Sequence, residues 1–391
     1  MYENQPIPAS RRSDVDPFRA MDVMAAANRM IAAGEDVISL AVGQPSAPVP
    51  SVVAEAVGAF LAKGRVGYTD ALGRASLRHR IARHYGEAYG VEVSPERVMV
   101  TTGSSAGFNL AFLTAFDAGD RVAISTPGYP AYRNILKALG IVPVEIPVGP
   151  EDDYILTAAA LERAHWDAPL KGVLIASPAN PTGTVTPLDE LRRLIEFADA
   201  EGIVFVSDEI YHGLAFGRET ASALQFSERA IVVNSFSKYY CMTGWRIGWL
   251  VLPPHLVRPS ERVGQSLYIS APELSQVGAE AVFGATDELE AVKLGYERSR
   301  RLLMEALPQL GFGDIAPIDG AFYAYARIPE AFEDATALAK HILETAHVAA
   351  TPGLDFDLQR GHRTMRLSYA GDPDEIAEAV RRLRAVPGLG S

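Results

Sequence analysis

The sequence predicts an α/β fold in which a large domain with a mostly parallel sheet is joined to a smaller α+β domain. From residue 97 onward, short apolar runs alternate with helical patterns, which is typical of parallel strands covered by helices on both faces. After residue 272 the pattern becomes mostly helical and contains two isolated strand-like runs. At 391 residues, the chain is long enough for one large domain and a smaller one.

The elements follow from the spacing of apolar residues and from Gly, Pro and cap residues. The amino-terminal region is expected to contain a polar arm (1–16), a helix (18–33), a short strand (37–40), a helix capped by Ser51 (51–61) and an amphipathic helix around residues 77–85. The strands expected in the large sheet are residues 98–101, 122–124, 173–176, 203–206, 230–233 and 247–251, with helices at 108–116 and 188–201. A long helix (287–307), strands 321–325 and 364–369, and a last helix opened by a capping box at Asp372–Glu375 should follow.

This order predicts three parts. Residues 1–46 should form an arm and part of the small domain, residues 47–285 the large domain, and residues 286–391 the small domain.

Composition excludes several classes of function. A net charge of −12 argues against a nucleic-acid partner, which requires clustered Lys and Arg. The single cysteine, Cys241, excludes an internal disulfide, and the eight histidines lack the spacing of a metal site such as HExxH. No apolar run has the length of a membrane span, and the first residues lack a signal pattern, so we expect a cytoplasmic protein.

The stretch from Ser235 to Gly248 carries the strongest chemical signal. It lies between two apolar runs that read as buried strands, and it contains Lys238, one of only six lysines against thirty arginines. A lysine among apolar neighbours can lose its proton, and a neutral amine can form a Schiff base. Ser235, Ser237 and Arg246 could bind an anionic group such as a phosphate. A Schiff-base lysine beside a phosphate site suggests pyridoxal 5'-phosphate.

Other polar residues follow the ends of predicted strands, where open α/β sheets bind their ligands. Ser104 and Ser105 open a helix, where free N–H groups favour a phosphate. Tyr129 could stack on the cofactor ring, and Asp208 could keep the ring nitrogen protonated.

Three further residues complete this constellation. Asn180 and Tyr211 could donate to the phenolate oxygen of the ring, and Arg366 is a forked donor suited to a substrate carboxylate. Taken singly, each of these residues also fits a structural role in a turn, a helix cap or the core. Their appearance on successive strand ends favours the cofactor interpretation.

A serine hydrolase is the alternative enzyme. Gly103–Gly107 matches G-x-S-x-G after a strand and before a helix, which would make Ser105 a nucleophile. Asp208 and either His347 or His362 would follow in the chain order of a hydrolase triad. That interpretation leaves Lys238 without a role, and no HGGG-like loop precedes the motif.

The run from Ser235 to Gly248 resembles the lysine motif of the class I/II aminotransferases, which belong to the aspartate aminotransferase superfamily of pyridoxal phosphate fold type I. The other motifs that resemble this family, in the same order along the chain, are Tyr68-Thr69 with Gly73 and Leu77-Arg78, Asn180–Gly183, Asp208–Tyr211, Ala321–Ala324 and Arg366–Ala370. The similarity extends from about Gly43 to Ala370. It implies a seven-stranded, mostly parallel sheet in the large domain.

The resemblance also implies roles for single residues. Lys238 would form the aldimine with the cofactor and transfer protons, and Arg366 would bind the substrate α-carboxylate with help from the backbone at Gly43 and from Asn180. Tyr68 would reach the phosphate of a neighbouring subunit, which implies a homodimer with shared active sites. The implied roles of the remaining residues, Ser104, Ser105, Tyr129, Asn180, Asp208, Tyr211, Ser235, Ser237 and Arg246, are the cofactor contacts given above.

The implied reaction is ping-pong transfer of an amino group between an L-amino acid and a 2-oxo acid. Relatives with the same cofactor residues also catalyse β-elimination, so a lyase is the alternative on this scaffold.

The sequence departs from the family at two positions. Position 105 is serine where some dicarboxylate-preferring relatives carry lysine, and Ala179 stands where Asn is common. The sequence does not name the amino donor.

Overall fold

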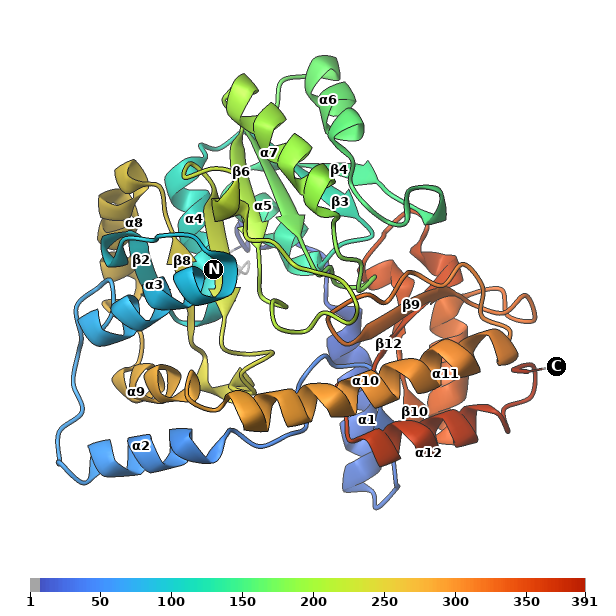
Figure 1. The fold of residues 1–391 in the computed structure, drawn as a ribbon. Coiled ribbons are helices and arrows are strands. Elements are labelled where there is room, and N and C mark those ends of the chain that lie inside the picture. The colour runs from blue at the N-terminus through green and yellow to red at the C-terminus, as the bar shows by residue number, and fades with distance from the viewer. Residues whose placement is uncertain (1–7, 391) are drawn as a thin grey trace, which may run out of the picture.

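The computed structural model describes residues 8–390, so the first seven residues of the predicted arm lie outside the described residues. Its large sheet has seven strands, as expected (Figure 1). Their order across the sheet is β2 (Val98–Thr101), β8 (Gly248–Val251), β7 (Ile231–Ser235), β6 (Val204–Asp208), β5 (Gly172–Ala176), β3 (Arg121–Thr126) and β4 (Val142–Pro147). Only β8 among these strands runs antiparallel to its neighbours. The carboxyl ends of the other six therefore meet at one edge.

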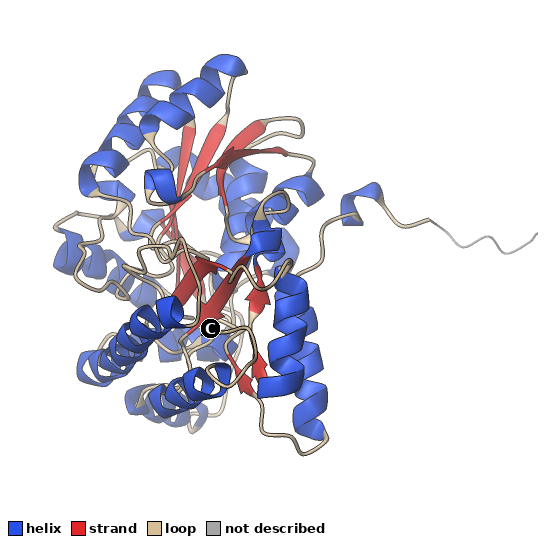
Figure 2. Cartoon of the chain, turned by 90° about the vertical axis from the view of Figure 1, so that its right-hand side faces the viewer, coloured by secondary structure: helices blue, strands red, loops and turns tan. Residues whose placement is uncertain are grey.

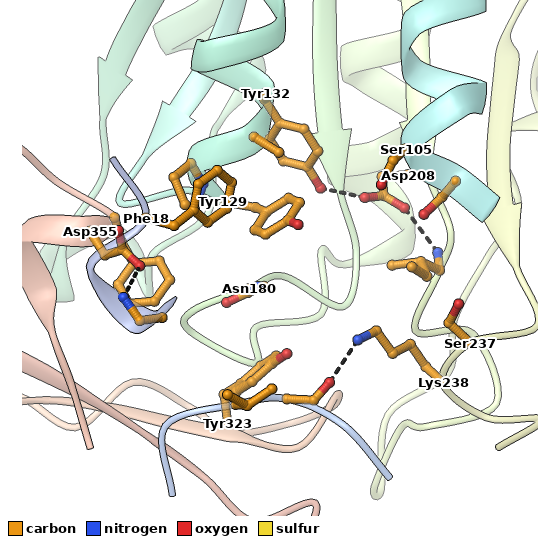
Figure 3. Close-up of a pocket in the computed structure, with 18 of the residues that line it drawn as sticks. Phe18, Ser105, Tyr129, Tyr132, Asn180, Asp208, Ser237, Lys238, Tyr323 and Asp355 are labelled. Atoms are coloured by element: carbon orange, nitrogen blue, oxygen red, sulfur yellow. Dashed lines mark hydrogen bonds between the residues drawn. The ribbon is translucent and has the colours of Figure 1, made fainter. Parts of the chain in front are cut away.

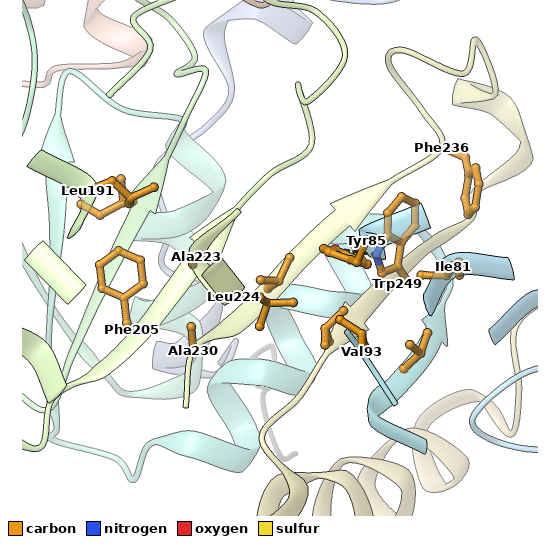
Figure 4. Packing of buried hydrophobic residues seen from close by; sticks show 14 of the residues in the cluster. Ile81, Tyr85, Val93, Leu191, Phe205, Ala223, Leu224, Ala230, Phe236 and Trp249 are labelled. Atoms are coloured by element: carbon orange, nitrogen blue, oxygen red, sulfur yellow. Dashed lines mark hydrogen bonds between the residues drawn. The ribbon is translucent and has the colours of Figure 1, made fainter. Parts of the chain in front are cut away.

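Both faces of the large sheet are buried because helices cover each of them (Figure 2). One face packs against α4 (Gly103–Ala115), α5 (Pro130–Leu139) and α8 (Pro254–Tyr268), and the other against α3 (Ala75–Tyr89), α6 (Ala158–Asp167) and α7 (Leu188–Glu201). Neighbouring residues on a strand point to opposite faces. Trp249 accordingly packs with Tyr85 and Phe236 (Figure 4), whereas Leu250 packs with Phe108 in the opposite layer. Burial on both faces explains the continuous apolar runs of these strands.

The smaller sheets lie beside this layer. Strands β11 (Thr351–Pro352), β12 (Thr364–Ser368) and β9 (Tyr323–Arg327) form an antiparallel sheet, and β1 (Ile38–Ser39) pairs in parallel with β10 (Val348–Ala349). The surrounding helices are α1 (Arg19–Ala32), α11 (Ala335–Ala346) and α12 (Pro373–Leu383). Amino-terminal residues therefore pair with the carboxyl-terminal third of the chain.

The long helix α10 (Thr286–Gln309) runs from the end of α9 (Glu273–Val282) toward the smaller sheets (Figure 1). Helix α2 (Ser51–Leu61) packs against α9. The exact division into domains at residues 46 and 285 stays a prediction.

Several elements were not predicted from the sequence, among them helices α5, α6 and α11, and two of them contain prolines that obscure the pattern. Strand β4 contains Pro143 and Pro147, which have no N–H to donate to a neighbouring strand. These prolines are tolerated because β4 is an edge strand. Helix α8 contains Pro259, which interrupts the helical pattern.

The cap predictions were partly wrong. Ser51 is the first residue of α2 and does not cap it; its hydroxyl and its backbone N–H both donate to the Glu288 carboxylate, at 2.8 and 3.1 Å. Asp372 does cap α12, but it accepts a hydrogen bond from the backbone N–H of the second helical residue, Asp374, at 2.8 Å. A capping box requires the N–H of the third residue instead.

Strand β9 begins two residues later than expected. None of the helices within residues 8–390 is both long and apolar enough to cross a membrane.

Candidate active site

A cavity of about 250 Å³ opens at the carboxyl edge of the large sheet, between that edge, the smaller sheets and the start of α1 (Figure 3). Most residues singled out from the sequence line it together. They are Gly43, Ser104, Ser105, Tyr129, Asn180, Asp208, Tyr211, Ser237, Lys238, Arg246 and Arg366. Two do not line it: Ser235 lies behind Ser237, and Tyr68 lies in the loop between α2 and α3.

Lys238 follows β7 and points into the cavity, where its Nζ donates to the carbonyl oxygen of Gly43 at 2.7 Å (Figure 3). Burial lowers the pKa of this amine to about 8, and the positive charges of Arg366 and Arg246 add to the effect. Near neutral pH such an amine is uncharged far more often than a solvated lysine. The site therefore holds a nucleophilic amine ready near neutral pH.

Asp208 is the last residue of β6 and is 2 % exposed. The Tyr132 hydroxyl donates to its Oδ2, and the backbone N–H of Ile210 donates to its Oδ1 at 3.0 Å. Burial nevertheless raises the pKa of this carboxyl to about 6. A cation placed beside Asp208 would favour its ionised form, as a protonated ring nitrogen does.

The start of α4 is a candidate anion site. No side chain caps the first turn of α4, and Ser104 and Ser105 in this turn line the cavity, where free N–H groups of a helix start favour an anion. Gly103 adopts φ +73°, and an added Cβ would lie 2.4 Å from Nη2 of Arg246, so only glycine lets this guanidinium pack against the helix end. Arg246 also donates to the Ser237 hydroxyl at 3.5 Å. These donors fit a phosphate. We call Ser104, Ser105, Asp208, Lys238 and Arg246 the polar end of the cavity.

Arg366, on β12, is held by stacking as well as by hydrogen bonds. Its guanidinium lies between the rings of Tyr323 and Phe356, 4.4 and 4.6 Å from their centroids. It donates to Asn180 Oδ1 at 2.9 Å and to the carbonyl oxygen of Ala41. A buried, oriented guanidinium of this kind suits a carboxylate.

Sequence reasoning missed several lining residues. Tyr132 lies in the first turn of α5, three residues after Tyr129 at the N-cap, and this short spacing could have found it. Tyr323, whose hydroxyl bonds that of Tyr211 at 2.8 Å, belongs to a motif already noted. Phe18 and Asp355 carry no local signal, because only the tertiary fold brings them to the cavity.

The structure does not assemble the hydrolase triad. Among the described residues that line the cavity with Ser105, none is a histidine. His347 instead pairs with Glu35 at 3.0 Å.

The comparisons with known proteins agree with this geometry. Residues 35–383 match the model of the family "Aminotransferase class I and II". The valine–pyruvate aminotransferase of Mycobacterium tuberculosis is 47% identical over 377 residues, which cover 95% of this chain and 96% of that protein.

Two solved structures agree as well. An aminotransferase from Mycobacterium tuberculosis superposes with a TM-score of 0.95 at 45% identity, over 98% of this chain and all of that one. Aspartate aminotransferase from Thermus thermophilus with maleate gives a TM-score of 0.91 at 31% identity, over 97% of this chain and all of that one. The chain therefore belongs to the class I and II aminotransferases, and it is an aminotransferase.

Proposed function

We propose that the chain moves an amino group between an L-amino acid and a 2-oxo acid with pyridoxal 5'-phosphate bound at the polar end, where Lys238 is the attachment and proton-transfer residue. The observation that carries this proposal is the half-buried Lys238, whose amine points into the same cavity as the buried carboxylate of Asp208. When bound, the cofactor supplies an aldehyde for amines and a protonated ring that withdraws electrons.

The residues present fit the three parts of the cofactor. Ser104, Ser105, Ser237 and Arg246 would hold the phosphate, and Ser235 would orient Ser237, because their hydroxyls lie 2.9 Å apart. The unpaired charge of a buried carboxylate costs free energy, which makes Asp208 the partner for a ring cation.

The cavity also offers groups for the ring and the substrate. Asn180 and Tyr211 would donate to the phenolic oxygen, and Tyr129 would lie against the ring. Arg366 would bind the α-carboxylate, with Asn180 and the backbone at Gly43 beside it. This arrangement would leave the α-hydrogen to Lys238, whose neutral amine accepts the proton and returns it.

We also propose that the chain acts as a homodimer with shared sites. Tyr68 supports this, because an aromatic side chain that is 81 % exposed is available to a second copy. The expected cytoplasmic location stays a prediction.

Replacing the lysine tests the proposal. Lys238→Ala should lower the transamination rate about 10²–10⁴-fold, the usual contribution of a general acid–base group. Borohydride treatment should fix the cofactor to the peptide that contains Lys238 in the wild type and in Lys340→Ala, whose lysine is surface-exposed. Full activity of Lys238→Ala, or labelling of another lysine, would refute the assignment. If the wild-type enzyme formed ammonia and pyruvate instead of a new amino acid, its reaction would be the β-elimination of a lyase.

A further inference from the structure

The cavity extends beyond the polar end toward the start of α1. We call Phe18, Met21, Ile135, Asp355 and Phe356 the arm end. Figure 3 shows Phe18 and Asp355 on the opposite side of the cavity from Lys238. We propose that the arm end binds an uncharged, apolar substrate side chain, so that the enzyme uses monocarboxylic amino acids and 2-oxo acids. This inference rests on the proposed function.

Within one copy of the chain, the described residues that line the cavity offer no free cation for a second carboxylate. The cations among these lining residues are Lys238, Arg246 and Arg366. Lys238 is the reactive amine, and Arg246 packs against the start of α4. Arg366 is fixed between two rings and would take the α-carboxylate.

The charged side chain at the arm end is itself an anion. Asp355 is 2 % exposed and accepts hydrogen bonds from the backbone N–H groups of Arg19 and Ala20, at 2.9 and 3.2 Å. Its charge would repel a carboxylate on the substrate side chain. The other four residues of the arm end are apolar, so they favour a hydrocarbon group.

Asp355 also positions the apolar residues. Helix α1 has no side-chain cap of its own, and the Asp355 carboxylate takes the place of a cap from 335 residues away in sequence. The segment that carries Asp355 is tied to the large domain, because the backbone N–H of Gly128 donates to the carbonyl oxygen of Phe356 at 3.1 Å. Phe18 in turn meets the edge of Tyr129, with ring centroids 6.1 Å apart. The arm end is therefore a built surface with contacts to both parts of the chain.

Binding of unreactive acids to the cofactor-loaded enzyme tests the charge argument. By calorimetry, 4-methylpentanoate should bind at least about 100-fold more tightly than glutarate, because a carboxylate buried without a partner is strongly disfavoured. Equal or tighter binding of glutarate would overturn the inference and leave the proposed function standing. If neither acid bound and no amino acid reacted, the carboxylate site at Arg366 would be wrong, and both proposals would fall.

Variants of the arm end test which residues select the side chain. Phe18→Ala should lower the ratio of kcat/KM for leucine to that for alanine about tenfold, because lost apolar contacts affect only the larger substrate. Met21→Arg should raise kcat/KM for aspartate relative to leucine at least about tenfold by supplying a cation. Met304→Arg on α10, also partly exposed, is the matched control and should change neither ratio. Unchanged ratios in both test variants would overturn the assignment.

A separate pair of variants tests the positioning role of Asp355. Asp355→Ala should raise KM for leucine with a smaller change in kcat, because α1 loses its anchor while the reacting groups stay in place. Asp355→Asn keeps an acceptor oxygen and should recover most of the loss. An equal loss of kcat for all substrates in both variants would contradict this role.

Discussion

The polar end and the arm end share one cavity but are built differently. The polar end takes its side chains from the carboxyl ends of β6 and β7 and from the start of α4, which one rigid sheet holds in place. The arm end takes Phe18 and Asp355 from segments more than 300 residues apart, joined by backbone hydrogen bonds to a single carboxylate. With the proposed roles, the polar end would carry groups that every substrate needs, and the arm end could change without disturbing them. This difference predicts that reaction type and substrate choice are set by separate parts of the chain.

The largest effect that tests this separation is expected from Asp208→Asn. Removing one partner of a buried ion pair costs about 3–5 kcal/mol, so activity should fall about 150-fold to 5,000-fold. Because Asp208 would act on the ring and not on the side chain, all amino acids should lose the same factor. The measurement is kcat/KM for leucine and alanine, and a changed ratio between them would break the separation.

Activity in this experiment should be read together with cofactor content. Ser222→Ala is a suitable control, because Ser222 is as buried as Asp208 and its hydroxyl donates to the neighbouring Glu209 at 3.0 Å without lining the cavity. It should reduce stability but leave turnover per bound cofactor near that of the wild type. A comparable loss of turnover in Ser222→Ala would point to general disruption of this edge of the sheet.

The two ends also differ in how far the sequence predicts them. Lys238, Asp208 and Asn180 each follow an apolar run within a few residues, so strand periodicity alone locates them at one edge of a sheet. The seven-stranded sheet follows from the same runs and the family resemblance, apart from β4, whose prolines obscure it. Ser235 has the expected polar type but lies behind the cavity wall, a difference of depth that no residue pattern encodes.

The arm end lacks such local signals. Asp355 follows Gly353 and Leu354 in a short 3-10 turn, and nothing near it indicates that its carboxylate holds α1. Its partners are backbone N–H groups, which every residue but proline offers, so the pairing leaves no trace in residue type. Tyr323 was part of a recognised motif, yet its bond to Tyr211 depends on how the two sheets face each other.

A smaller effect is expected from Tyr132→Phe, which removes the hydroxyl that donates to Asp208. Hydrogen bonds to charged groups are worth about 1.5–3 kcal/mol, so cofactor affinity should fall about tenfold or more. The hydroxyl opposes the effect of burial on the pKa of Asp208, which is raised to about 6, so its loss raises that pKa further. The variant should therefore bind the cofactor most weakly at low pH, where the Asp208 carboxyl is protonated. Its affinity should increase as the pH rises past the new pKa of Asp208.

Titration of the cofactor-free protein with pyridoxal phosphate between pH 5.5 and 8 measures this dependence. Tyr85→Phe is the matched control, since Tyr85 is equally buried and its hydroxyl accepts from Trp249 at 3.0 Å away from the cavity. That variant should lose some stability but keep the wild-type pH dependence of cofactor affinity. If Tyr132→Phe lost the same factor at every pH, the hydroxyl would act through packing instead of through the charge of Asp208. If it changed the leucine-to-alanine ratio, Tyr132 would also belong to the arm end, and the boundary between the two ends would have to move along α5.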